Sequence, residues 1–216
     1  RVDYGDALMS PFVGDRNLPR FASLSAGDLL CGPWDVYSGQ AQGWLYPPGA
    51  PDSQAGYDGL RLAITYVMTT RGMPYVYYGD EFGMPGAGDP DNRRMMRFGA
   101  DLGFLEFEML GFVQQLGALR AEHPALRTGA WPDSLVAWPS ILAWARTSAD
   151  ETVIVVLKRE GSTGNLSIPV ASLGVSDGAV FDRHDLGASG TGTATVASGH
   201  LTVPLASTAA VIFTSR

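Results

Sequence analysis

The chain has 216 residues, of which 45% are hydrophobic and 17% are charged, a composition typical of a globular protein of one or two domains. Its formal net charge is −7 and its isoelectric point lies near 4.8. Nucleic-acid binding needs clustered Lys and Arg to displace counterions, so we expect no nucleic-acid partner. No apolar run reaches the roughly 18 residues of a membrane-spanning helix, so we expect no membrane partner either.

The first residues of the chain and its single cysteine say little about cellular compartment. Residues 1–6 contain no apolar block of the signal-peptide kind. Arg1 stands where an initiator Met would be, which we interpret as the sign of a longer, cut or processed protein. The single cysteine, Cys31, cannot form an intramolecular disulfide, and no Cys or His spacing matches a zinc site.

One helix and one strand are predicted after a long loop. Ala22–Gly56 is rich in Gly, Pro, Ser and Asp, which predicts a long ordered loop. Helical spacing of apolar residues predicts a helix over Tyr57–Thr70, with Gly72 ending it. The aromatic and β-branched run Met73–Tyr78 has the character of a short buried strand.

A charged loop and a second helix follow. Gly, Pro and charged residues mark the loop over Asp80–Phe98. The strongest periodicity in the chain then predicts a helix over Leu102–Glu122, which Pro124 ends. The order of strands, long loops and helices implies parallel βα units, in which the loops at the carboxyl ends of strands carry the chemistry.

Beyond Thr128, short β-rich runs separated by turn residues predict strands, with no helical pattern between them. The runs are Ile141–Arg146, Thr152–Leu157, Leu166–Val170, Leu201–Leu205 and Ala209–Thr214. This part of the chain is therefore predicted to be an antiparallel β-sandwich.

Three stretches, read together, resemble the α-amylase family of glycoside hydrolases in order and spacing. They are Phe12–Phe21 (FVGDRNLPRF), Gly72–Arg94 (GMPYVYYGDEFGMPGAGDPDNRR) and Leu116–Gly129 (LGALRAEHPALRTG). The resemblance implies an α/β fold in which Leu8–Val13 and Met73–Tyr78 are the seventh and eighth strands of a (β/α)8 TIM-type barrel. Residues 1–127 would be the C-terminal portion of that barrel, and residues 128–216 the all-β antiparallel sandwich domain that follows it.

The same resemblance implies a partner for this chain. A complete barrel needs roughly 250 residues, so we expect the N-terminal barrel half in the same parent protein or in a companion chain. The chain alone is predicted to be inactive. Secreted or periplasmic localisation is what the family favours, with any targeting segment outside these residues.

Family members cleave α-glucosidic bonds with retention, using a nucleophile and a general acid roughly 5 Å apart. In the family pattern both follow earlier strands that this chain does not contain. A third carboxylate assists from an Asn-His-Asp motif after the seventh strand, and the matching residues here are Asp15, Arg16 and Asn17. Asn17 replaces the stabilising Asp, and losing such a charge commonly lowers the rate by about 10²-fold or more. Compensation by Asp15 is the alternative.

Further residues are expected to contact an α-glucan or maltooligosaccharide-type substrate. They are Arg16, Arg20, Trp34, Trp44, Tyr46, Asp80, Glu81 and Arg93. Aromatic faces pack on the apolar face of glucose, and the three aromatics of this set are better candidates for exposure than Tyr77 and Tyr78, which we expect to pack in the strand. For Arg16, an ion pair with Asp15 or Asp80 that only holds the loop is the alternative, and Arg20 has a similar one.

A second set of acidic residues is interpreted as structural. Asp89, Asp91 and Asn92 lack the ligand spacing of an EF-hand and have arginines beside them, so we predict a salt-bridged loop and no metal site. We expect no cofactor in this chain, and calcium is left open for the missing part of the parent protein.

Two functions remain in view. The first is part of an α-amylase-type hydrolase or transglycosidase. The second, which the departure at Asp15, Arg16 and Asn17 motivates, is a catalytically degenerate homologue that serves as a glycan-binding or assembly partner.

Overall fold

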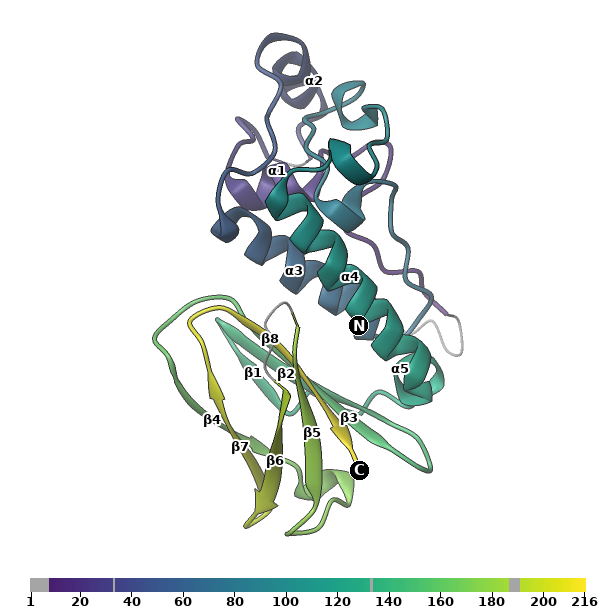
Figure 1. Ribbon diagram of the computed structural model, residues 1–216, viewed down its shortest axis with the longest axis vertical. Coiled ribbons are helices and arrows are strands. Elements are labelled where there is room, and N and C mark those ends of the chain that lie inside the picture. The colour runs from purple at the N-terminus through teal and green to yellow at the C-terminus, as the bar shows by residue number, and fades with distance from the viewer. Residues whose placement is uncertain (1–7, 33, 133, 187–190) are drawn as a thin grey trace. The chain divides into compact units, whose positions relative to one another are not determined.

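The computed structural model describes residues 8–32, 34–132, 134–186 and 191–216 (Figure 1). The chain divides into two compact units. Unit 1 comprises residues up to Pro11, Met68–Pro74 and Gly117–Arg216, and unit 2 comprises Phe12–Val67 and Tyr75–Leu116. Unit 1 takes residues from both predicted domains, so the domain boundary at residues 127 and 128 stays a prediction.

Unit 2 is built from helices and short 3-10 turns. These are α1 (Phe21–Ala26), α2 (Val36–Leu45), most of α3 (Gln54–Thr69) and α4 (Phe104–Glu122), with η1 (Asp80–Phe82), η2 (Asp91–Arg93) and η3 (Gly99–Asp101). The helices predicted over 57–70 and 102–122 are confirmed as α3 and α4. The two helices run side by side (Figure 1), with the Arg61 guanidinium 5.6 Å from the centre of the Phe112 ring. Their apolar stripes are buried, as the periodicity requires.

The prediction of a long loop over residues 22–56 is wrong, because most of α1 and all of α2 lie in this range. The Gly, Pro, Ser and Asp content of this segment was interpreted as a loop signal, but Gly39 and Gly43 lie inside α2 and are contact points. A Cβ on Gly43 would come within 2.7 Å of the Asp91 Cβ, and the N–H of Gly88 donates to the Gly39 carbonyl at 3.0 Å. Small residues here let α2 lie directly against η2 and the loop before it. This tertiary reason for a glycine is not contained in local helix propensity.

These helical glycines allow a matched prediction. A Cβ on Gly111 in α4 would meet no atom within 4 Å, so Gly111→Ala should raise the free energy of unfolding by roughly 0.5–1 kcal/mol through helix propensity. Gly43→Ala should instead lower it by about 1–3 kcal/mol, because Asp91 and its loop must move. Urea denaturation of both variants checks the signs. Equal effects would contradict the close contact of α2 with the loop.

Neither segment expected as a barrel strand is a strand in the structure. Residues 8–13 and 73–78 are extended, but a single backbone hydrogen bond among the described residues joins them, from the Met73 N–H to the Met9 carbonyl at 3.0 Å. A strand assignment needs a repeated ladder of such bonds. The barrel part of the predicted fold is therefore not shown directly.

The two extended segments nevertheless run side by side in the same direction. The Met73 N–H bonds to the Met9 carbonyl. Further along both segments, the Phe12 ring packs edge-on against the Tyr75 ring, with centroids 6.2 Å apart. Because the contacts advance along both segments together, the loops that follow Val13 and Tyr78 leave from the same end of the pair. This is the arrangement on which the candidate site depends.

The C-terminal part of unit 1 is an eight-stranded antiparallel sheet in the order β1-β2-β3-β8-β5-β6-β7-β4. The strands are β1 (Val136–Trp138), β2 (Ile141–Thr147), β3 (Thr152–Lys158), β4 (Gly164–Pro169), β5 (Val180–Asp185), β6 (Thr191–Ala197), β7 (His200–Leu205) and β8 (Ala209–Ser215). The five predicted runs are confirmed as β2, β3, β4, β7 and β8. The sheet folds over on itself (Figure 1), which fits the predicted sandwich. β1, β5 and β6 escaped prediction because they are short or rich in polar and small residues.

The sandwich core lies between the inward faces of these strands. It includes Ile154 and Val156 from β3, Phe181 from β5, Val203 from β7 and Phe213 from β8, all fully buried. Strand β7 alternates exposed and buried residues, the pattern of a strand with one solvated face. Helix α5 (Pro124–Thr128) packs against β2 and β3, so β3 is buried on both faces.

A buried arginine ties the sheet to the helix ends within unit 1. The guanidinium of Arg146 on β2 donates to the carbonyls of Thr69, Leu126 and Gly129 at 2.9, 3.0 and 2.8 Å. Burial, and then the charge of nearby Arg120, lowers the pKa of Arg146 to about 10. Helix C-terminal carbonyls carry partial negative charge, so they are suitable acceptors for a buried cation.

Candidate functional site

The loops that follow Val13 and Tyr78 are joined by a buried arginine. Arg20 is 0% exposed, and its guanidinium donates to the Asp80 Oδ1 at 3.0 Å, the Tyr78 carbonyl at 2.6 Å and the Asn92 carbonyl at 2.8 Å. The charge also lies over the Tyr77 ring, 4.3 Å from its centroid. Arg20 therefore has no exposed surface for a sugar, and its contacts favour the loop-holding alternative over direct substrate binding.

Asp80 is the acidic partner of this clamp. Burial raises the pKa of Asp80 to about 6, although the Arg20 charge acts in the opposite direction. Its Oδ2 is buried with no hydrogen-bond partner among the described residues. A Cβ on Gly14 would lie 2.7 Å from that oxygen, so the carboxylate would have to shift to accept a side chain where the first loop passes over it.

The pKa of Asp80 predicts a pH dependence of stability. Since its folded-state pKa lies above the unfolded value near 3.8, its stabilising contribution is complete below pH 3.8 and is lost as pH rises through about 6. Asp80→Asn should remove this component. The free energy of unfolding of the native protein should therefore fall relative to that of the variant as the pH is raised from 4 to 7. Denaturant titrations at both pH values check this. A difference that does not change with pH would contradict it.

Asp15 shapes the turn that presents its neighbours. Its Oδ1 accepts hydrogen bonds from the N–H groups of Asn17 at 2.7 Å and Leu18 at 3.0 Å, which makes an Asx turn. The side chains of Arg16 and Asn17 are exposed at the tip. The carboxylate of Asp15 is thus engaged in holding the turn.

Asn92 attaches this turn to the second loop. It is fully buried, and its amide Nδ2 donates to the carbonyls of Arg16 at 3.0 Å and Leu18 at 2.8 Å. The Arg93 Nε also donates to the Arg16 carbonyl, at 3.1 Å. Sequence reasoning missed Asn92 as a linking residue, because an asparagine in a charged loop is ordinarily exposed and nothing local marks its partners 74 and 76 residues away.

The prediction of a salt-bridged loop around Asp89 and Asp91 is confirmed. Arg93 forms a salt bridge with Asp89 at 2.7 Å. Arg94 forms a bidentate salt bridge with Asp91, in which both N–O distances are 2.8 Å. Asp91 also accepts from the Ala87 N–H. These contacts give the second loop its own rigidity. Among the described residues, Asp80 pairs with Arg20 and not with Arg16.

The three aromatic candidates are exposed, as predicted. Trp34, Trp44 and Tyr46 are 79%, 70% and 70% exposed. They gather at and around α2, with Trp44 inside this helix and not in a loop. Glu81 is half-buried in η1.

The structure therefore separates the candidates into two groups. Asp15, Arg16, Asn17, Arg20, Asp80 and Arg93 come together in the two joined loops, which we call the loop cluster. The aromatics lie at and around α2. Contact of either group with a sugar stays a prediction.

No group of three or more His, Cys, Asp or Glu in the described segments could hold a metal ion. No helix within those segments is long and apolar enough to cross a membrane.

Comparison with known proteins identifies relatives. The chain is 32% identical over 120 residues to a cyclomaltodextrinase of Geobacillus thermopakistaniensis, a match that covers 53% of this chain and 19% of that protein. It is 36% identical over 121 residues to neopullulanase 2 of Thermoactinomyces vulgaris, covering 53% and 20%. These matches confirm the resemblance to the α-amylase family. The chain spans about a fifth of the length of these relatives.

A solved structure supports the fold. The chain superimposes on the α-amylase of Geobacillus thermoleovorans, crystallised in complex with acarbose, with a TM-score of 0.71 and 22% identity, over 97% of this chain and 39% of that one. No family model matches the chain. Similarity in fold to this structure thus covers 97% of the chain, whereas similarity in sequence to the cyclomaltodextrinase covers about half of it.

Proposed function

We propose that this chain is part of an α-amylase-type glycoside hydrolase that acts on α-glucosidic bonds by a retaining mechanism, with the nucleophile and general acid outside its residues. The observation that carries the proposal is the loop cluster: an Asx turn presents Arg16 and Asn17 beside the loop after Tyr78, and the buried pair of Arg20 and Asp80 holds both loops. The names of the relatives, and acarbose bound to a structurally similar amylase, support an α-glucan as substrate.

In this proposal the residues of the loop cluster position and bind a sugar without breaking bonds. The exposed side chains of Arg16 and Asn17 hydrogen-bond to sugar hydroxyls. Arg20 and Asp80 act as positioning residues, since neither reaches solvent. Asn17, being neutral, stabilises developing positive charge less than a carboxylate would.

The proposed domain organisation follows from the same reasoning. Residues 1–127 would complete a (β/α)8 barrel with an N-terminal half from the same parent protein or a companion chain, and residues 128–216 would form the sandwich domain. The exposed side chains of Met9, Phe12 and Met73 on the extended segments are consistent with a neighbouring segment in the whole protein.

Restoring the upstream portion, by co-expression or in the full-length protein, tests the proposal. Reducing-sugar release from starch and maltooligosaccharides is expected above that of a variant whose nucleophile has been removed. Equal rates for the two proteins would contradict an enzymatic role.

A second function is favoured by one specific observation. The position expected to carry a stabilising charge is the neutral, exposed Asn17, and the carboxylate of Asp15, the alternative source of that charge, accepts two backbone hydrogen bonds. A glycan-binding or assembly homologue would retain such a surface without turnover. Calorimetry with maltooligosaccharides would then give binding heat in a protein that releases no reducing sugar, whereas turnover would exclude this alternative.

A further inference from the structure

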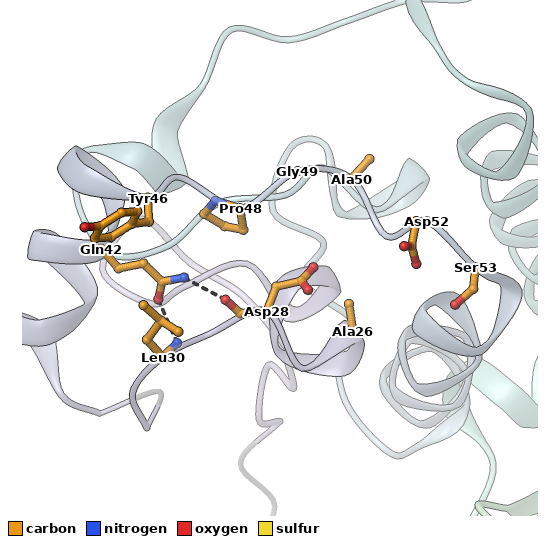
Figure 2. A pocket seen from close by; sticks show the side chains of 10 residues that line it. All are labelled: Ala26, Asp28, Leu30, Gln42, Tyr46, Pro48, Gly49, Ala50, Asp52 and Ser53. Carbon is orange, nitrogen blue, oxygen red and sulfur yellow. Dashed lines mark hydrogen bonds between the residues drawn. The ribbon is translucent and has the colours of Figure 1, made fainter.

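A cavity of about 360 Å³ opens between the end of α2 and the loop that leads into α3. Figure 2 shows Tyr46, Gln42 and Leu30 on one side, Asp52 and Ser53 on the other, and Asp28 between them. Pro48, Gly49 and Ala50 pass along one edge. The lining shares no residue with the loop cluster, and Tyr46 is the one candidate site residue in it.

Helix α2 fixes the aromatic side of the cavity. Gln42 is 5% exposed, and its amide is held at both ends: Nε2 donates to the Asp28 carbonyl at 2.6 Å, and Oε1 accepts from the Leu30 N–H at 2.9 Å. Tyr46 follows the last residue of α2, and its N–H donates to the Gln42 carbonyl at 2.7 Å, which caps the C-terminal end of the helix. The exposed Tyr46 ring therefore starts from a rigid backbone position.

The lining suits a neutral ligand that is rich in hydroxyl groups. The carboxylates of Asp28 and Asp52 and the hydroxyl of Ser53 are exposed hydrogen-bonding groups. None of the ten described residues that line the cavity is Lys, Arg or His, so an anionic ligand would meet two negative charges with no cation beside them. The Tyr46 ring offers an apolar face to the C–H face of a sugar.

We propose that this cavity binds a short segment of a neutral α-glucan, with Tyr46 against a sugar ring on one side, Asp52 and Ser53 bonded to sugar hydroxyls on the other, and Asp28 between them. The volume lies within the range of small-molecule sites. The identity of the ligand rests on the proposed function. The position and polarity of the cavity are independent of the proposed function.

Hydrogen exchange with maltotriose as the probe tests this site. The full-length protein is used with its nucleophile removed, so that the probe is not consumed. We expect slower exchange in peptides covering residues 42–53, with the half-saturating concentration about tenfold higher in Tyr46→Ala. Asp52→Asn, a milder change at an exposed position, should raise it severalfold. Tyr37→Ala removes an exposed ring from α2 outside the cavity and serves as the matched control.

The outcomes separate this site from the proposed function. The site is supported if maltotriose protects residues 42–53 and this protection is weakened in Tyr46→Ala and Asp52→Asn but kept in Tyr37→Ala. This holds even if the active protein releases no reducing sugar. Unchanged exchange with maltotriose, or protection that neither cavity variant weakens, would overturn it, even if hydrolysis were observed.

Discussion

Replacing Arg20 by alanine is expected to lower the free energy of unfolding by about 3–5 kcal/mol. The substitution removes the guanidinium that meets Asp80, two backbone carbonyls and the Tyr77 ring, and it leaves the buried Asp80 carboxylate without its cation. A buried charge that loses its partner is costly, because it cannot recover its hydration. Equilibrium denaturation of the variant at pH 7 measures this loss.

Two comparisons separate this effect from the loss of any arginine. Arg159→Ala removes an arginine that is 69% exposed and pairs with the exposed Glu160, so it should change stability by no more than about 1 kcal/mol. The double variant Arg20→Leu with Asp80→Asn should be less destabilised than Arg20→Ala, because it leaves no unpaired buried charge. Equal losses for Arg20→Ala and Arg159→Ala would contradict the clamp.

The combined substitution Asp15→Asn, Arg16→His and Asn17→Asp is expected to raise the hydrolytic rate of the full-length protein by about 10²-fold. It places a carboxylate at the position where the family resemblance implies one, beside the developing positive charge of the transition state. Asn in place of Asp15 keeps a side-chain oxygen that accepts the N–H groups of residues 17 and 18, so the turn should persist. The rate on maltooligosaccharides measures the effect.

Single substitutions identify the source of any gain. Asn17→Asp alone should supply most of it, and Asp15→Asn alone should lower the rate only if Asp15 compensates for the missing charge. No gain in the combined variant, in a protein whose circular dichroism is unchanged, would favour the degenerate homologue over the enzyme.

The regular elements that could be predicted are those in which local and global signals agree. The apolar spacing of α4 and the β-branched runs of β3 and β8 are strong, and each was identified within a few residues. Helix α2 was missed because its Gly39 and Gly43 serve contacts with Gly88 and Asp91, which no local pattern contains. The strand character of 73–78 was overestimated, since composition predicts an extended backbone but not a hydrogen-bonded neighbour.

The candidate site could be predicted only in part. The exposure of Trp34, Trp44 and Tyr46 could be predicted, because aromatic residues in Gly- and Pro-rich segments point to surface positions. Contact of the candidate residues with a sugar stays a prediction. The buried roles of Arg20, Asp80 and Asn92 depend on partners 58 to 76 residues away along the chain. Such pairings follow from the tertiary fold, so the sequence alone left the sugar-contact and loop-holding roles of Arg20 open.

The most direct test of the proposed site is a crystal structure of the full-length protein with acarbose. We expect a sugar hydroxyl within about 3 Å of the Asn17 or Arg16 side chain, with the loops after Val13 and Tyr78 still joined by Arg20 and Asp80. Acarbose bound elsewhere, with the tip of the Asx turn facing away from it, would contradict a substrate-binding role for the loop cluster.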